Sequence, residues 1–389
     1  MRVRARIPKV ETAVKQKPTE CPYKGCRGRY FKMHQAGCRK PLRDTKLDQV
    51  TAERWKCLKC GRTHRVYPTG VSPAQQSDRL KGASVLFYIL GMSYRGVEDI
   101  LEALGFCLDH VTIYRNVQAA GEQVRQLRKT WLQHGCGKIA VVGSDLTYLR
   151  CSGDQVAIAV AVDAESGMML DIEIVENEET ETLKGWLKPL LELVGAEVLT
   201  TDDQDGFKAV ADYAGVGHQI CRQHVTRNGL DFVAKAAEQI LEKPPTVPPG
   251  LDLTPEQLLE DLAELEWILL GHPGNAERLL AKLYDRYAPA PAPKKGRRAS
   301  VWYRMRNHVL RLWNHWQRYT CYRGAGADDK LSVPETNNVT ERAIGWNVKE
   351  RYRTMRGYKR NDSIRNVTIL TAWLREEPRG RDMSTLYAA

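Results

Sequence analysis

The sequence predicts a multidomain protein: a cysteine-rich module and a group of helices come first, followed by an α/β core that an all-α insertion interrupts. Three observations support this prediction. The chain has 389 residues, which is more than most single domains contain. Closely paired cysteines occur only near its start. Runs of β-branched residues alternate with helical periodicity between residues 138 and 224 and nowhere else.

Charge is distributed unevenly along the chain. Residues 1–70 hold 19 Lys and Arg against 5 Asp and Glu, residues 71–293 hold 19 against 33, and residues 294–360 hold 17 against 5. Basic segments favour a polyanionic partner, because neutralised phosphates release their counterions. The acidic middle would repel such a partner unless some carboxylates bind divalent cations. The alternative is a solvated surface whose charge is merely uneven.

The sequence contains no sign of a membrane or secretory segment. No apolar run reaches the ~20 residues that span a bilayer, and the basic start lacks an apolar signal region. We therefore expect a cytoplasmic, nucleoid-associated protein with no membrane partner. In that compartment the 10 cysteines indicate metal ligands or buried thiols and not disulfides.

The first two segments differ in their cysteine content. Residues 1–20 are expected to form a flexible basic arm, and residues 21–73 a loop-rich zinc ribbon. The pairs Cys-x4-Cys and Cys-x2-Cys supply four thiolates, which suit tetrahedral Zn²⁺ and would stabilise a segment of low apolar content. Spare ligands are His34, Cys38 and His64, and the alternative is buried or idle cysteines. The predicted zinc ligands are Cys21, Cys26, Cys57 and Cys60.

Residues 74–135 have the apolar spacing of three helices, expected at 74–90, 93–104 and 109–121. The turn before the third contains Gly105, as in a helix-turn-helix, and Asp109 is a candidate N-cap. The alternative is a connector bundle that does not touch DNA. In a DNA-binding domain the third helix would present to a major groove His110, Thr112, Tyr114, Arg115 and Gln118.

The α/β core begins with three predicted strands at 138–150, 155–167 and 168–176. A helix, a short strand, a second helix and another strand follow. This is the element order of an RNase H-like core. We expect that core in two parts, 136–229 and 331–389, separated by an all-α insertion at 230–330.

Two acids follow neighbouring strands of this core. Asp145 and Asp202 are each expected at a strand end, so that both carboxylates project from one sheet edge. With Glu341 from the closing helix 338–353, they can hold two Mg²⁺ or Mn²⁺ about 4 Å apart. Their repulsion without cations predicts a loosely ordered site or a protonated acid. The competing acids are Asp203, expected on the opposite strand face, Asp205, expected to cap the next helix, and Asp154.

The segments GSDLTYL, CRQHVTRN and PETNNVTERAIGWNVKERYR resemble bacterial insertion-sequence DDE transposases of the Mutator-like type, over about residues 138–360. The resemblance implies an RNase H-like catalytic core with the triad Asp145, Asp202 and Glu341. It implies binding of terminal inverted repeats, followed by metal-dependent DNA cleavage and strand transfer. It also implies a basic residue seven positions after the glutamate, where this chain has Val348, so the candidates are Lys349 and Arg351.

The Cys-x2-His signature of that family falls at Cys221 and His224. Three interpretations stay open: a zinc half-site, placement of the scissile phosphate by His224, or simple packing of a strand–helix junction. Cys221 and Asp203 are further candidates for support of the catalytic site.

Residues 301–323 combine aromatic and basic side chains. The stripe Trp302, Met305, Val309, Leu312 and Trp316 has the i, i+3, i+4 spacing that favours a core, although stacking on unpaired bases is an alternative. The arginines off this stripe are expected to meet DNA, together with Lys294, Lys295, Arg297 and Arg298.

The predicted partners are double-stranded DNA, as transposon ends and target, and further copies of the chain. At least a dimer is expected, because two ends must be brought together. Two other functions remain alternatives: a zinc-ribbon/helix-turn-helix regulator with an inert scaffold, and a structure-specific nuclease that cuts without joining.

Overall fold

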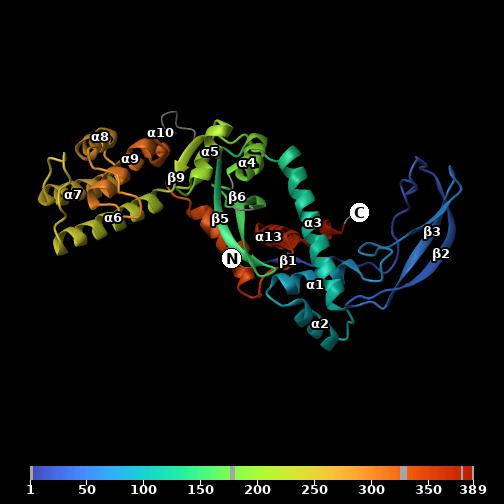
Figure 1. Cartoon of the computed structure of the whole chain (residues 1–389). Helices are drawn as coiled ribbons and strands as arrows, with labels where there is room; N and C mark the ends of the chain where they lie inside the picture. The colour runs from blue at the N-terminus through green and yellow to red at the C-terminus, as the bar shows by residue number, and fades with distance from the viewer. Residues whose placement is uncertain (1–2, 176–179, 325–330, 378–379, 388–389) are drawn as a thin grey trace.

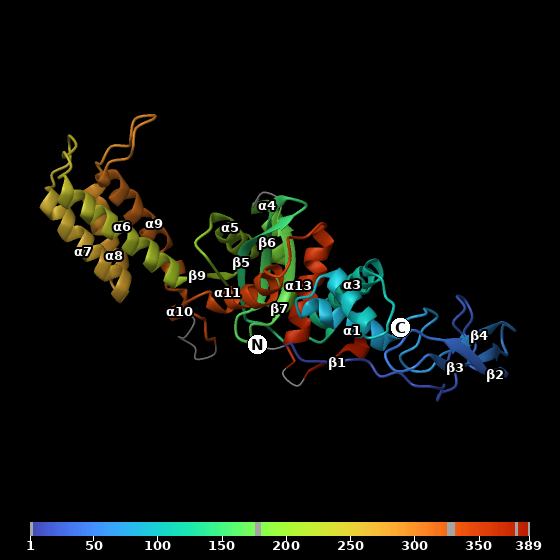
Figure 2. The ribbon, with the colours of Figure 1, turned by 90° about the horizontal axis from the view of Figure 1, so that it is seen from below.

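The computed structural model describes residues 3–175, 180–324, 331–377 and 380–387. Glu176, the last residue of the third predicted strand, and residues 325–330 of the predicted insertion lie outside this range. Three parts follow one another in space: a sheet of the cysteine-rich segment, a central α/β body and a group of helices (Figure 2). In the described part of the chain, no helix has the length and apolar character needed to cross a membrane.

The first residues are bound to the body, so the expectation of a flexible arm is wrong. Strand β1 (Ala5–Arg6) pairs in parallel with β10 (Arg381–Asp382), close to the other end of the chain. Further along, the Glu11 N–H donates to the Thr69 carbonyl over 3.0 Å. These backbone contacts join segments far apart in sequence, which periodicity within one segment does not reveal.

The cysteine-rich segment has more regular structure than its loop-rich sequence suggests. It forms an antiparallel sheet in the order β2-β3-β4, with β2 at Phe31–Pro41, β3 at Gln49–Cys57 and β4 at Thr63–Val66. One face of β3 buries Trp55 and Cys57, and the other exposes Arg54 and Lys56. This sheet lies at the far end of the molecule from the helices between α6 (Arg222–Glu242) and α9 (Val301–Tyr319) (Figure 1).

Three helices follow: α1 (Asp78–Ile89), α2 (Tyr94–Ala103) and α3 (His110–His134). As expected, Asp109 caps α3, and its side chain accepts from the N–H groups of Val111 and Thr112. Helix α3 runs well beyond residue 121, because its second half packs on α13 (Asn361–Arg375). Helix α13 is buried on almost every side and so has no polar face by which sequence analysis could have recognised it.

The central sheet has five strands in the order β7-β6-β5-β8-β9. The middle strand of the first three, β6, runs antiparallel to both β7 and β5, and β8 and β9 run parallel to β5. Helices α4 and α5 pack on one face, while α11 and α13 lie against β5, β6 and β7 on the other. The expected order of strands and helices is confirmed. The elements are β5 (Val141–Cys151), β6 (Asp154–Asp163), β7 (Met169–Val175), α4 (Thr180–Val194), β8 (Val198–Thr201), α5 (Asp205–Ala214) and β9 (Gly217–Ile220).

The helical group has its own hydrophobic core, and the aromatic stripe of α9 belongs to it. Trp302, Met305 and Val309 are fully buried, so the core interpretation of the stripe is correct. Two of the arginines of α9, Arg311 and Arg318, form ion pairs with Asp203 and Asp212. The helices are α6 (Arg222–Glu242), α7 (Pro255–Gly271), α8 (Ala276–Tyr287), α9 (Val301–Tyr319) and α10 (Cys321–Gly324).

The chain then returns to the sheet through a helix with an irregular centre. Helix α11 (Asn338–Ile344) continues into a π-helical turn, η1 (Gly345–Lys349), and then into α12 (Glu350–Tyr352). The closing helix expected at 338–353 is therefore present, with a wider turn in the middle. Such π-turns often occur at functional sites. The described chain ends with β10 and a 3₁₀ turn, η2 (Met383–Leu386).

Candidate active site and cysteine centre

Neighbouring parallel strands bring the first two acids level with each other. Val141 of β5 pairs with Val198 of β8, and Gly143 pairs with Thr200. Asp145 lies two residues after Gly143, and Asp202 lies two residues after Thr200. The same register therefore places the two acids level with each other along the strand direction. Asp145 does not end its strand as expected, because β5 continues alongside β6 to Cys151. It lies just past the part of β5 that β8 covers.

The third acid comes from α11, which crosses closely over β5. A Cβ on Gly143 would collide with Oγ1 of Thr340, so only glycine permits this approach. Asn337, at the start of α11, donates from Nδ2 to the Ser144 carbonyl over 3.0 Å and from its N–H to Cys221 Sγ over 3.3 Å. These contacts place Glu341, one turn later, above the end of the sheet.

Four side chains gather at this edge: one ligand atom each from Asp202, Cys221, His224 and Glu341 lies within 4.8 Å of all the others. His224 Nδ1 is 2.7 Å from Asp202 Oδ1, and His224 Nε2 is 3.6 Å from Glu341 Oε1. The closer pair lacks hydrogen-bond geometry, so both of its atoms are buried without a hydrogen-bond partner. Buried polar atoms need a partner, and carboxylate oxygens are ligands that Mg²⁺ and Mn²⁺ accept. The donor set therefore fits a divalent cation.

Asp145 interacts with this cluster electrostatically. Its pKa is raised from 3.8 to about 7, first by burial, then by the charge of Asp202 and more weakly by that of Glu341. The Leu146 N–H, 2.7 Å from Oδ1, and the charge of Lys349 act in the opposite direction. A protonated acid agrees with expectation, but burial rather than repulsion is the larger cause.

The competing acids do not join the cluster. Asp203 forms ion pairs of 2.7 Å with Lys208 and 2.8 Å with Arg311, so two cations already neutralise it. Asp205 lies in the first turn of α5, where it pairs with Lys208 over 2.9 Å. Asp154 pairs with Cys151 at the far end of the β5–β6 hairpin. None of the three is in position to share a cation with Asp202 and Glu341.

The two signature residues have different surroundings. Cys221 is completely buried, its pKa is raised by that burial, and its sulfur accepts the Asn337 N–H. These observations favour packing of the β9–α6 junction. His224, in the first turn of α6, instead faces the carboxylates of Asp202 and Glu341.

The two candidate basic residues after Glu341 differ in their exposure and contacts. Lys349 is exposed, and its positive charge partly offsets the rise in the pKa of Asp145. Arg351 is only 3% exposed, lies 4.1 Å over the ring of Tyr88 and donates to the Met92 carbonyl. The expectation that Arg351 contacts DNA is therefore wrong for this conformation, because its guanidinium holds α12 against the helices at the other side of the body.

The residues expected in a major groove also differ in their exposure and contacts. Arg115 is exposed on α3, whereas Gln118 accepts from Asn366 of α13 and has a buried Nε2. The expected groove contact of Gln118 is wrong, since the helix turns this side chain into the body. Tyr114 packs edge-on against Tyr94. The remaining predicted DNA contacts are partly or fully exposed: His110, which also contacts Glu98, Thr112, Arg297 and Arg298.

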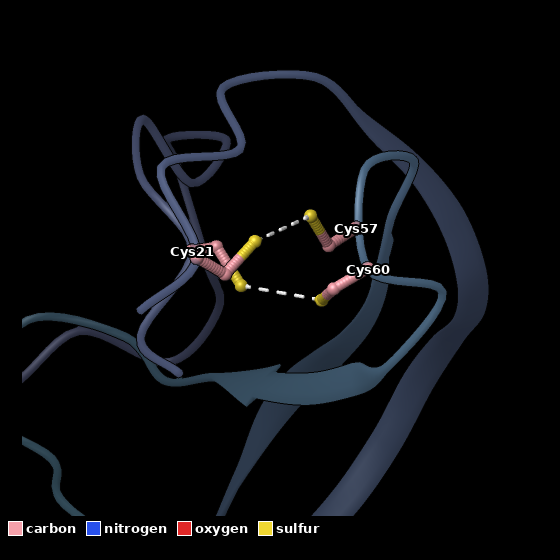
Figure 3. A group of neighbouring side chains, drawn as sticks. Cys21, Cys57 and Cys60 are labelled. Carbon is pink, nitrogen blue, oxygen red and sulfur yellow. Dashed lines mark hydrogen bonds between the residues drawn. The ribbon is translucent and has the colours of Figure 1, made fainter. Parts of the chain in front are cut away.

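The paired cysteines converge as their spacing predicts. The thiols of Cys21, Cys57 and Cys60 turn toward one another (Figure 3). The Sγ atoms of Cys21 and Cys60 are 3.8 Å apart, as are those of Cys26 and Cys57, and all four lie within 4.8 Å of one another. Four sulfurs about 2.3 Å from a tetrahedral Zn²⁺ would be about 3.8 Å apart, so the site has the right size.

Its surroundings fit a metal as well. A Cβ on Gly28 would lie 2.5 Å from Cys57 Sγ, so glycine leaves room for the sulfurs. The pKa of Cys60 is lowered to about 6, first by the backbone N–H of Arg62, which favours the thiolate form that binds metal, whereas burial raises the pKa of its neighbour Cys21. The spare candidates His34, Cys38 and His64 are not members of the described cluster.

The fold and the site together define an α/β protein with clustered carboxylates at the edge of a mixed sheet. Residues 70–244 match the family model described as "Transposase, Mutator family". The resemblance seen in the sequence is thereby confirmed.

No curated protein matches the chain. Two solved structures of the HTLV-2 integrase catalytic core domain in complex with magnesium, a dimeric and a trimeric form, are similar to it. Both are 16% identical with a TM-score of 0.19, covering 34% of this chain and 86% and 85% of theirs.

Proposed function

We propose that the protein is a DDE DNA transposase with an RNase H-like catalytic core, which binds terminal inverted repeats and carries out metal-dependent DNA cleavage and strand transfer. One observation carries the proposal: Asp202 and Glu341 come from segments far apart in sequence and meet beside His224, with Asp145 level with Asp202. Unrelated surface acids would have no reason to converge, and the family match supports the same activity.

The proposed roles follow from the geometry. Asp145, Asp202 and Glu341 would hold two Mg²⁺ or Mn²⁺, which activate an attacking water or 3′-hydroxyl and stabilise the leaving oxygen. Asp145 would give up its proton as the cations bind, because their charge reverses the effects that raise its pKa. His224, between two of the carboxylates, can donate a hydrogen bond to the scissile phosphate. Exposed Lys349 can contact a neighbouring phosphate.

The remaining parts would bind and arrange DNA. Zn²⁺ on Cys21, Cys26, Cys57 and Cys60 would stabilise the zinc ribbon, and α3 would present Arg115 to the element end in the manner of a helix-turn-helix. Arg297 and Arg298, on the exposed loop between α8 and α9, can reach phosphates. Two element ends must be held together, so we propose a homodimer or larger assembly as the active form.

A strand-transfer assay with the element's own ends and Mg²⁺ tests the proposal. We expect Asp145→Asn, Asp202→Asn and Glu341→Gln each to lower cleavage and joining by orders of magnitude while end binding survives, since each removes a ligand charge and keeps the shape. Asp205→Asn is the matched control, because this carboxylate is 94% exposed and only three residues from Asp202. A Glu341→Gln protein that joins DNA at the normal rate would refute the triad. Cutting without joining would indicate a nuclease, and binding without cutting a regulator.

A further inference from the structure

The sheet of the cysteine-rich segment places like charges directly opposite each other. Lys32 of β2 pairs with Lys56 of β3, and Arg54 of β3 pairs with Arg65 of β4. Residues directly opposite in an antiparallel pair share a face, and residues two apart on one strand do so too. All four side chains therefore project from the same face, which we call the open face.

The two faces of this sheet differ in what covers them. Trp55 and Cys57 of β3 are buried on the inner face, whereas Val50 and Ala52, which share a face with Arg54, are buried near the other end of the strand. On the open face, Lys32, Arg54, Lys56 and Arg65 are all exposed. The only acid within these three strands, Glu53, accepts from Trp55 Nε1 over 3.0 Å and so serves the inner face. Within the part of the chain that the structure describes, no carboxylate lies within ion-pair distance of the four cations.

This arrangement weakens the sheet by itself. Like charges directly opposite on neighbouring strands are destabilising, and here two such pairs lie side by side with no acid to offset them. Of the four cations, Arg54 alone makes a hydrogen bond with a residue that the structure describes, donating from Nε to Thr63 Oγ1 over 3.1 Å. A polyanion lying across the open face would attract all four cations, so that their charges would stabilise the complex instead of destabilising the sheet.

The open face is also accessible to a large partner. The sheet lies at one end of the molecule, away from the central body (Figures 1 and 2). Among the strands of the described residues, β2 is at the edge of this sheet, and its register shifts twice, between Met33 and Gln35 and between Gln35 and Cys38. Such bulges increase strand twist, and a twisted ribbon can follow a duplex groove.

We propose that the open face binds the phosphate backbone of duplex DNA, and that its role is to position the chain and not to read sequence. The choice of DNA as the polyanion rests on the proposed function. Phosphate contacts fix orientation without specifying bases. In this proposal the open face binds the DNA backbone, and the exposed start of α3 contacts base edges.

Salt-dependent binding of the full-length chain to an element-end duplex and a random duplex tests this proposal. Replacing Lys32, Arg54, Lys56 and Arg65 together by Ala should reduce the slope of log affinity against log salt by up to about 4. Affinity at moderate salt should fall ~10- to 1000-fold, equally on both duplexes. The matched control replaces the same amount of exposed charge on the distant helices, Lys235, Lys243, Arg278 and Lys282, and should leave the slope nearly unchanged.

A second variant separates phosphate contact from base reading. Arg54→Lys with Arg65→Lys keeps the charge but removes the planar, two-pronged donors, so it should bind both duplexes like the wild type. Loss of end preference in this variant would overturn the positioning role. Zinc content measured on every variant shows that the sheet remains folded.

The remaining outcomes are decisive too. An alanine variant that keeps the wild-type slope, or a control variant that loses as much, overturns the proposal. Failure of the proposed function is seen separately, in a wild-type chain that does not join DNA at saturating duplex and Mg²⁺. The alanine variant should still join DNA under that saturation, because the open face is not in the catalytic cluster.

Discussion

The pKa of Asp145 is raised toward neutrality because burial and the charge of Asp202 both disfavour its ionised form. Its pKa is 3.8 in a flexible chain and about 7 in the folded protein. Between these values the folded state binds more protons than the unfolded state, so stability falls as the pH rises through this window. A bound cation removes the penalty by compensating the negative charge.

The expected result is a pH-dependent stability that one substitution changes. Without metal, the central body should lose stability from about pH 4 to about pH 7, and Asp145→Asn should flatten that part of the profile. Thermal unfolding followed across this range measures it. Mg²⁺ at neutral pH should raise the unfolding temperature of the wild type but not of Asp145→Asn. Identical profiles for the two proteins would contradict the ionisation argued for Asp145.

At the scale of elements, Asn337 fastens the helix of the third acid to the other two segments of the site. It is 1% exposed, donates to Ser144 of β5 and to Cys221 at the start of α6, and begins the helix that carries Glu341. The side-chain hydrogen bond is buried, so its loss is costly. Asn337 is thus a positioning residue, acting through Glu341.

Replacing Asn337 by Ala should lower stability by about 1–3 kcal/mol and should weaken Mg²⁺ binding and the rate of joining by roughly tenfold or more. The expected signature is a fall in the maximal rate and in metal affinity with unchanged binding of end DNA. Asn338→Ala is the matched control, because this neighbouring side chain is exposed. Equal activity of the two variants would exclude a positioning role.

The contact between α3 and α13 depends on a glycine. A Cβ on Gly121 would lie 2.5 Å from both Cβ and the carbonyl oxygen of Asn366, so the helices cannot stay this close with any larger residue. Gly121→Ala should destabilise the central body by about 1–3 kcal/mol, as overpacking does. Gly185→Ala in α4 meets no atom within 4 Å and should be neutral or slightly stabilising, because alanine favours helix. Denaturant unfolding of the two variants distinguishes a packing effect from a propensity effect.

At the scale of the whole molecule, different forces hold the three parts together. The helices α6–α9 share a hydrophobic core, and the central sheet has cores on both faces. The cysteine-rich sheet buries few large side chains, and its four thiols lie at zinc-binding separation. We infer that metal stabilises this part and apolar burial the other two.

Removing one thiol should therefore unfold one part only. Cys57→Ser, or treatment with a strong chelator, should release one Zn²⁺ and make residues 21–66 sensitive to protease while the central body and the helices stay resistant. Metal analysis and limited proteolysis measure both effects. Cys107→Ser is the control, because this exposed cysteine lies outside the cluster. Absence of zinc from fully reduced wild-type protein would contradict the prediction.

Some features follow from sequence alone because they depend on local spacing or on residue chemistry. The cysteine pairs, the Asp109 cap, the buried stripe of α9 and the order of elements in the central sheet were all predictable on that basis. The acids could be nominated too, since carboxylates at matching positions of neighbouring parallel strands must lie near each other.

Tertiary structure decided the rest, because it depends on contacts between residues far apart in the chain. Ala5–Arg6 of the basic arm pair with β10, and the guanidinium of Arg351 contacts the Tyr88 ring and the Met92 carbonyl. Helix α13 is buried without a polar face. Only the pairing register shows which cations of the cysteine-rich sheet stand opposite one another. The periodicity of one segment does not show which distant residues it will contact. The sequence therefore determined which residues could act, and the fold determined which of them meet.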